Sequence, residues 1–334
     1  MTLPPALPPA LRGSMAPRDA VLLAILVALV ALVATRAPGF AAPGNLAAIL
    51  NDTAILVILA LGQAVVILTR GIDLSVASNL ALSGMIVAML DASYPGLPLV
   101  LLIALAGLIG LVLGAFNGLM VWRAAIPPIV VTLGTLAAYR GLAFLVSGGA
   151  WVNAHELSRD FIAVPRQTLL GLPVLTWVAV ALVAVVALFL SRTPLGRSLY
   201  AAGGNPTAAE YVGIDIGRAQ FSAFCISGAL AGLCGYLWVS RYAVAYVEIA
   251  SGFELDVIAA CVIGGVSIAG GLGTVAGIVL GALFLGVVKN ALPVIGVSPF
   301  WQLAVSGTVI ILAVIVNARQ HRPKGRLILR EAHA

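Results

Sequence analysis

The sequence contains very little charge. Only 9% of its 334 residues are Asp, Glu, Lys or Arg, whereas soluble proteins have about 25%, and 62% are hydrophobic. The mean hydropathy is +1.13. No soluble fold of this length hides so much apolar surface, so the surrounding medium is lipid. The apolar runs lack the strict alternation of barrel strands and favour helices, which predicts an all-α integral membrane protein in the lipid bilayer.

Residues for catalysis and metal binding are equally scarce. Three cysteines (Cys225, Cys234, Cys261) lie in or beside apolar runs without paired metal-ligand spacing, which suits small packing residues. The three histidines lie outside the apolar runs, so no intramembrane Ser–His pair is available. The phosphate-binding pattern G-x4-G-K-[ST] is missing, so this chain cannot hold ATP by such a loop. We therefore expect a protein that is not an enzyme, with no catalytic residues, no metal site and no cofactor of its own.

Long apolar runs divide the chain into about ten predicted transmembrane helices. A run of about 20 residues crosses a bilayer as a helix. The first run also resembles a signal-peptide core, but the many runs that follow favour a first membrane span. The predicted spans are 21–35, 46–69, 73–90, 97–122, 126–147, 171–190, 218–240, 254–269, 272–290 and 299–317.

The basic residues assign a side of the membrane to each loop. Of the 18 Lys and Arg residues, ten spans with a cytoplasmic N-terminus place twelve inside, five outside and Arg140 within a span. This bias follows the positive-inside rule, and anionic headgroups explain the formal charge of +6 without any nucleic acid. We expect a disordered cytoplasmic tail (1–18), a transmembrane domain (19–317) containing a cytoplasmic loop (191–218), and a basic cytoplasmic tail (318–334). The polar insert 148–167 falls outside.

Two features of the spans indicate special packing. Tight turns at Arg70–Asp73 and Gly270–Gly273 suit broken or re-entrant helices. Glycines recur at every fourth residue in two places, Gly110, Gly114 and Gly118 in one and Gly273, Gly277 and Gly281 in the other. Such faces let helices approach closely, either within one subunit or at a subunit interface.

Polar residues within the spans are few and mostly neutral. Ionisable groups inside a membrane mark a pathway by default, and here most acids lie at helix ends, where Asp73 also suits a helix cap. Neutral groups suit a passage for an uncharged, hydroxyl-rich solute, although each also suits a hydrogen bond between helices. The candidate path residues are Gln63, Asp73, Asn79, Asn117, Thr132 and Thr135.

The cytoplasmic loop carries one strongly polar, helix-compatible stretch with regularly placed small residues. Small side chains on a short amphipathic segment allow a partner to approach closely, so we interpret this stretch as a docking surface for a separate motor. Its candidate contact residues are Gly196, Ala201, Asn205, Ala208, Ala209, Gly213 and Ile214.

Several of these stretches together resemble a known family. They are LGQAVVILTRGIDLSVA (61–77), IPPIVVTLGTLAAYRG (126–141), GRSLYAAGGNPTAAEYVGI (196–214), FELDVIAACVIGGVSIAGGLGTVAG (253–277) and the final span. In this order they resemble the permease subunits of bacterial ATP-binding-cassette (ABC) importers of the ribose/xylose/galactose branch.

The resemblance implies a permease fold of about ten helices in the bacterial inner membrane, paired with a second permease subunit as a homodimer or heterodimer. It also implies a cytoplasmic ATP-binding subunit, which docks on 196–214, and a periplasmic sugar-binding protein.

The sequence departs from ribose permeases at Arg70 and Ser78, where those proteins tend to have glycine. Arg70 is similar to autoinducer-importing relatives, whereas GGAWVNAH (148–155) and SRYAVAYVEIA (240–250) look closer to rhamnose permeases. The expected solute is a monosaccharide, with a deoxyhexose such as rhamnose favoured. The alternatives are a quorum-sensing autoinducer in the same family, an ion-coupled sugar carrier and a membrane enzyme, although the last has no catalytic dyad.

Overall fold

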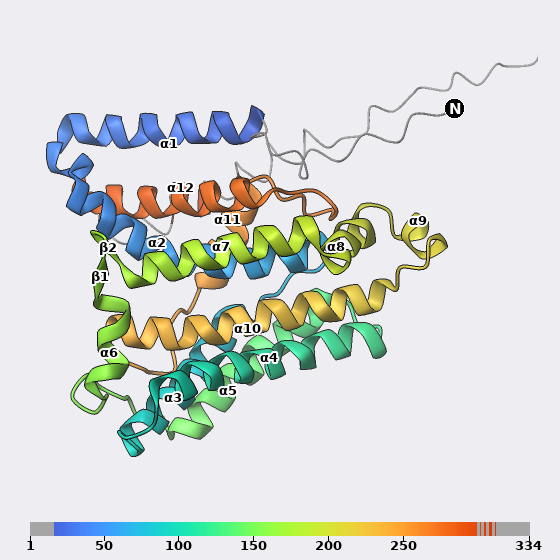
Figure 1. The fold of residues 1–334 in the computed structure, drawn as a ribbon, viewed down its shortest axis with the longest axis horizontal. Coiled ribbons are helices and arrows are strands. Elements are labelled where there is room, and N and C mark those ends of the chain that lie inside the picture. Colours follow the sequence, from blue (N-terminus) through green and yellow to red (C-terminus); the bar gives the residue numbers. More distant parts are fainter. Residues whose placement is uncertain (1–16, 299–300, 302–303, 305–306, 309–310, 312–334) are drawn as a thin grey trace, which may run out of the picture.

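Helices form almost all of the regular structure in the computed structural model, which describes residues 17–298 together with 301, 304, 307, 308 and 311. Figure 1 shows the long helices lying roughly side by side in one bundle. In chain order the elements are α1 (Pro17–Arg36), the 3-10 helix η2 (Pro38–Ala41), α2 (Pro43–Leu68), α3 (Val76–Ser93), α4 (Leu99–Arg123), α5 (Pro128–Ser147), α6 (Arg159–Arg166), β1 (Thr168–Leu169), β2 (Leu172–Pro173), α7 (Val174–Arg192), α8 (Pro194–Gly204), α9 (Pro206–Tyr211), α10 (Ile216–Tyr242), α11 (Phe253–Ile263) and α12 (Val275–Val294).

Eight described helices are long and apolar enough to cross a membrane, which confirms an all-α membrane protein and makes ten spans an approximate count. They are α1, α2, α3, α4, α5, α7, α10 and α12. The predicted span 254–269 is corrected: only the 11 residues of α11 are helical there, about 16 Å at 1.5 Å per residue, or half of a bilayer core. The predicted final span and tail lie largely or wholly outside the described residues, as does most of the predicted tail 1–18.

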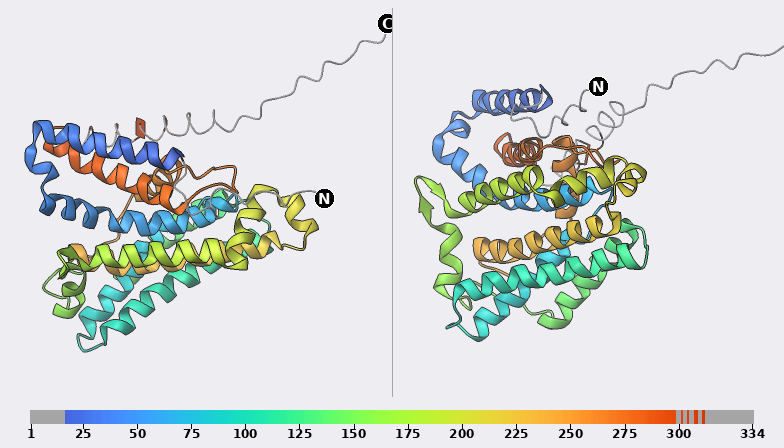
Figure 2. Two further views of the ribbon diagram at one scale, coloured as in Figure 1. Left: turned by 45° about the horizontal axis from the view of Figure 1, so that its top comes forward. Right: turned by 45° about the vertical axis from the view of Figure 1, so that its right-hand side comes forward.

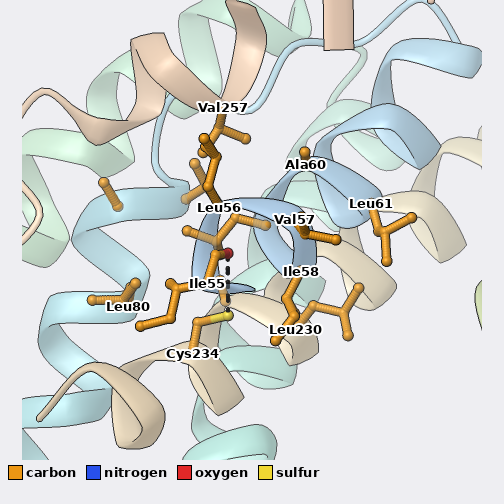
Figure 3. Packing of buried hydrophobic residues seen from close by; sticks show 14 of the residues in the cluster. Ile55, Leu56, Val57, Ile58, Ala60, Leu61, Leu80, Leu230, Cys234 and Val257 are labelled. Carbon is orange, nitrogen blue, oxygen red and sulfur yellow. Dashed lines mark hydrogen bonds between the residues drawn. The ribbon is translucent and has the colours of Figure 1, made fainter. Parts of the chain in front are cut away.

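Helix α2 runs through the centre of the bundle. Its residues from Thr53 to Leu68 are all buried, as expected for a helix that is apolar on every face. Figure 3 shows Ile55, Ile58 and their neighbours enclosed by side chains of α3, α10 and α11, with the Cys234 thiol directed at the Ile55 carbonyl. Cys234 and Cys261 are fully buried and free, which agrees with a packing role.

Glycines bring α10 into backbone contact with its neighbours. A Cβ added to Gly110 or Gly114 of α4 would lie 2.2 Å from a carbonyl oxygen of α10, and one added to Gly235 of α10 would lie 2.5 Å from the Leu80 carbonyl of α3. Gly281 of α12 meets the Ala260 carbonyl of α11 in the same way. These glycine faces therefore pack helices within one chain.

Two irregular segments interrupt the helices at the predicted turns. Residues 69–75 separate α2 from α3, and residues 264–274 separate α11 from α12. We call them segment A (69–75) and segment B (264–274). Both lie beside the C-terminal end of α8: a Cβ on Gly203 of α8 would lie 1.8 Å from the Leu68 carbonyl just before segment A, and the Tyr200 hydroxyl of α8 donates to the Gly273 carbonyl of segment B at 3.0 Å.

The two ends of the bundle carry different structures. Helices α8 and α9 project from one end, whereas α6 and the β1–β2 hairpin cover the other (Figures 1 and 2). At the α6 end, the Asp91 carboxylate accepts bonds from the Ser158 N–H and hydroxyl, each at 2.7 Å. Trp151 also stacks on Tyr246. The predicted outer insert and the predicted cytoplasmic loop thus lie at opposite ends, as a membrane-spanning topology requires.

The glycine contacts generate a prediction with a matched control on one helix. Gly114→Ala places a methyl group 2.2 Å from the Phe224 carbonyl, whereas a Cβ at Gly107 meets no atom within 4 Å. We expect Gly114→Ala to lower the stability of the detergent-purified chain by about 1–3 kcal/mol, a usual cost of overpacking. Gly107→Ala should match the wild type. Thermal unfolding of both variants measures this, and equal melting temperatures would contradict the packing assignment.

Candidate functional site

Asp73 is the centre of a buried polar cluster within the helix bundle. Its carboxylate accepts bonds from the N–H and the hydroxyl of Ser75, at 2.9 and 2.7 Å, and from the Ser227 hydroxyl at 3.2 Å. The side chain is 2% exposed. The cap that the sequence suggested is not formed: Asp73 lies two residues before the N-cap Ser75, α3 has no side-chain cap bond, and the bond from the Ser75 N–H closes a local turn ahead of the helix. The bond from Ser227 of α10 joins segment A to that helix.

Three more predicted path residues lie around Asp73. With its amide oriented to suit its neighbours, Gln63 donates to the Asp73 carbonyl and accepts from the Asp73 N–H, both at 3.1 Å. Asn117 of α4 donates to the Ser75 hydroxyl at 2.8 Å, and Thr132 of α5 donates to the Ile72 carbonyl at 3.0 Å. Side chains from α2, α4, α5 and α10 therefore hold segment A in place.

The other two path candidates have different partners. Asn79 donates to the Gly110 carbonyl at 3.1 Å and accepts from Ser83. Thr135 donates to the Val131 carbonyl of its own helix at 3.1 Å and is 7% exposed. All six candidates are thus buried, but only four meet around segment A. Because their polar groups bond to the protein itself, direct contact with a solute requires the cluster to rearrange.

Sequence reasoning missed three members of this cluster: Ser75, Ser227 and Tyr139. The Tyr139 hydroxyl bonds to the Leu113 carbonyl at 2.8 Å and to the Asn117 amide oxygen at 3.2 Å. A signal for it existed, because Tyr139 follows Thr132 by seven residues and therefore shares its helix face. Ser75 belongs to the motif that drew attention to Asp73. Ser227 gave no signal, since it is one of several small residues on an apolar helix.

The α8–α9 segment is built by side-chain caps. The Thr193 hydroxyl accepts from the Gly196 N–H at 2.9 Å and starts α8. The Asn205 side chain accepts from the Ala208 N–H at 3.1 Å and starts α9. Asp215 accepts from the Arg218 N–H at 2.9 Å and starts α10. Each cap satisfies an N–H group that the first turn of a helix leaves free, so side chains at the turns themselves define where α8, α9 and α10 begin.

The predicted docking residues divide into exposed and buried ones. Asn205, Ala208 and Gly213 are exposed, and Ala201 and Ile214 are partly exposed. Gly196 and Ala209 are buried, and a Cβ on Gly196 would lie 2.3 Å from the Phe189 carbonyl. The small size of Gly196 therefore lets α8 pack against the end of α7, and neither buried residue offers an exposed surface to a partner.

The exposed surface of the segment also contains features that the small-residue pattern did not show. Tyr211 and Val212 at the tip are 87% and 75% exposed. A groove of about 640 Å³ lies beside α8 at the start of α10, where its lining includes Leu195, Arg197 and Ile214. Large exposed apolar side chains at the end of a membrane protein are typical of a partner surface.

These features define a multi-pass helical membrane protein with a buried polar cluster, in which amides and hydroxyls surround one carboxylate, and a capped helical segment outside the bundle. The family model described as "Branched-chain amino acid transport system / permease component" matches residues 45–314. The chain belongs to this permease family.

Three named relatives are similar to this chain along most of its length. It is 39% identical to the autoinducer 2 import system permease protein LsrC of Enterobacter sp. (strain 638), over 89% of this chain and 85% of that protein. It is 36% identical to the ribose import permease protein RbsC of Escherichia coli (strain K12), over 90% and 93%, and 40% identical to the probable ABC transporter permease protein y4mJ of Sinorhizobium fredii (strain NBRC 101917 / NGR234), over 87% and 86%. No solved structure gives a significant match.

The resemblance to sugar-importer permeases is thereby confirmed. The chain is a permease subunit of an ABC importer, which is a transporter component and not an enzyme. Its location is the inner membrane, with multiple membrane-spanning helices.

The Asp73 contacts predict a difference between two substitutions. Asp73→Ala removes the acceptor of three buried donors, and leaving such groups without a partner costs about 1–3 kcal/mol. Asp73→Asn keeps an acceptor for Ser75 and a polar group for Ser227. We expect a clear fall in the melting temperature for Asp73→Ala and a small change for Asp73→Asn. Identical unfolding curves for the alanine variant and the wild type would refute the cluster.

Proposed function

We propose that this permease carries an uncharged monosaccharide inward, and that a 6-deoxyhexose such as rhamnose is its physiological solute. The observation that carries the proposal is the chemistry of the polar cluster, where one carboxylate is surrounded by amides and hydroxyls of Gln63, Ser75, Asn117 and Tyr139. Such groups exchange hydrogen bonds readily with the hydroxyls of a sugar. The relatives named for ribose import and for autoinducer 2 import support a polar solute.

The cluster suits an amino acid less well, although the family description mentions branched-chain amino acids. An amino acid needs an anion for its ammonium group and a cation for its carboxylate. Asp73 supplies the first. The nearby helix α5 carries Arg140, but this guanidinium donates to the carbonyls of Val247 and Ile249, the latter at 2.8 Å, and is therefore already engaged. A neutral solute avoids this mismatch in charge.

The proposed complex adds three components to this chain. A cytoplasmic ATP-binding subunit docks on α8–α9, a periplasmic sugar-binding protein docks at the end that carries α6, and a second permease subunit completes the membrane part. Membership of the ABC permease family supports this assembly and favours it over the ion-coupled alternative. Autoinducer 2 remains the second candidate solute, because a permease for it is 39% identical to this chain.

The solute is tested by deleting the gene and restoring it on a plasmid. We expect the deletion strain to lose uptake of labelled rhamnose and the restored strain to regain it, with glucose uptake unchanged in both. Loss of autoinducer 2 uptake with normal rhamnose uptake would replace the sugar with the second candidate. Loss of uptake of a branched-chain amino acid alone would overturn the argument from the charge of the cluster.

The docking surface is tested with a bulky substitution. Ala208 is exposed on α9, so Ala208→Trp leaves the membrane bundle intact but obstructs a closely fitted partner, at a cost of about 1–3 kcal/mol. We expect a normal amount of protein in the membrane, but loss of co-purification with the ATP-binding subunit and loss of uptake. Ala154→Trp, at an exposed site in the outer insert, is the control and should retain co-purification. Wild-type uptake by Ala208→Trp would show that α9 is not the docking element.

A further inference from the structure

Arg70 has a backbone conformation that normally belongs to glycine. Its φ is 66°, in the left-handed region that few non-glycine residues occupy. It is the second residue of segment A, just after the end of α2 and three residues before Asp73. The side chain extends to α8, where Nε donates to the Gly203 carbonyl at 2.7 Å and a terminal nitrogen donates to the Gly204 carbonyl at 3.4 Å. This one guanidinium therefore bonds to two residues that lie 133 and 134 positions further along the chain.

The acceptors of these bonds explain why arginine suits the site. Gly203 and Gly204 are the last residues of α8, and the final carbonyls of a helix have no partner within it and carry partial negative charge. A guanidinium offers several N–H groups in a rigid plane and can bond to two of these carbonyls together. Glycine would adopt the φ of position 70 more easily but would remove both side-chain bonds to the end of α8.

The backbones around Arg70 touch without side chains between them. A Cβ on Gly203 would lie 1.8 Å from the Leu68 carbonyl oxygen, and one on Gly271 would lie 2.3 Å from the Gly204 Cα. The Gly271 N–H donates to the same Leu68 carbonyl, and the Arg70 side chain packs against Gly270. The end of α8, the start of segment A and segment B therefore form one contact, which we call the three-way junction (Leu68–Arg70, Gly203–Gly204 and Gly270–Gly271).

The three-way junction connects the exposed α8–α9 segment with the buried cluster. Closely packed protein is hardly compressible and passes a displacement on to its neighbours. Asp73 follows Arg70 by three residues, and its partners reach α10 through Ser227 and α4 through Asn117 and Ser75. A continuous series of contacts therefore connects α8 with α10 and α4, and a movement of α8 is passed to both helices through it.

We propose that Arg70 is a positioning residue that fastens α8 to segment A, so that movement imposed on α8 reaches the polar cluster and changes solute access. This inference rests on the proposed docking of the ATP-binding subunit at α8–α9. Arg70 acts through segment A and does not itself touch the solute. Its loss should leave binding and hydrolysis of ATP intact while separating hydrolysis from transport.

The experiment uses the complete complex of permease, ATP-binding subunit and binding protein in lipid vesicles. Arg70→Gly removes the two bonds and relieves the strained φ, so the fold is retained. Arg70→Lys keeps a charged donor of similar length, and Arg123→Ala removes an exposed arginine that stacks on Trp122. ATP hydrolysis, its KM for ATP and uptake of labelled rhamnose are measured for each variant.

For Arg70→Gly we expect the KM for ATP and the hydrolysis rate of the wild type, with about tenfold less sugar transported per ATP, a change typical of coupling between linked sites. Arg70→Lys should restore part of this ratio, and Arg123→Ala should retain all of it. A wild-type ratio in Arg70→Gly would overturn the inference, and so would a parallel loss of hydrolysis, transport and melting temperature, because that pattern indicates a purely structural role. If the wild-type complex itself fails to hydrolyse ATP in response to the loaded binding protein, the proposed function falls, and this inference with it.

Discussion

A bilayer core contains no water to satisfy backbone N–H and C=O groups, and the rest of this structure depends on that constraint. Irregular backbone is tolerated at membrane depth only where protein encloses it. Here segment A (69–75) receives bonds from Thr132 to the Ile72 carbonyl and from Gln220 to the Thr69 carbonyl. Tyr200 does the same for Gly273 of segment B (264–274). The neutral polar groups proposed for the solute path therefore also hold the interrupted helices together.

Enclosing two irregular segments requires helices that approach closely, and glycine provides this. Lipid gives helices no hydrophobic reason to associate, so van der Waals packing and hydrogen bonds between them decide their arrangement. Gly110 and Gly114 of α4 meet Gly228 and Gly232 of α10 at backbone distance. The Asn79 amide of α3 then reaches the Gly110 carbonyl, which a larger side chain at this crossing would displace. Packing and polar bonding thus reinforce each other. Helix α10 packs against α2, α3 and α4 and holds these three helices together.

Much of this arrangement follows from local sequence signals. Apolar length predicted eight of the spans, and the turn residues predicted both interruptions. Apolar length alone misplaced the end of α11, because the apolar run continues into segment B whereas the helix ends at Ile263. The sequence also did not show that Gly196 is buried or that Arg70 reaches Gly203, since burial and a contact over 133 residues depend on the tertiary arrangement. Local sequence therefore predicted the helical spans and their interruptions more reliably than the contacts of single residues.

The central claim is that movement imposed on α8–α9 when ATP binds passes through the three-way junction, so that segment B, which contributes Gly270–Gly271 to it, moves with α8–α9. Pulsed spin-label distances test it most directly in the complete complex, with the three native cysteines replaced by alanine. One pair of labels joins exposed Thr207 of α9 to Leu272 of segment B, and a reference pair joins Thr207 to Asn153 of the outer insert. Between nucleotide-free and ATP-bound states, the account predicts a constant first distance, within about 2 Å, the size of ordinary helix shifts, and a changed second distance. A first distance that changes as much as the second would contradict it.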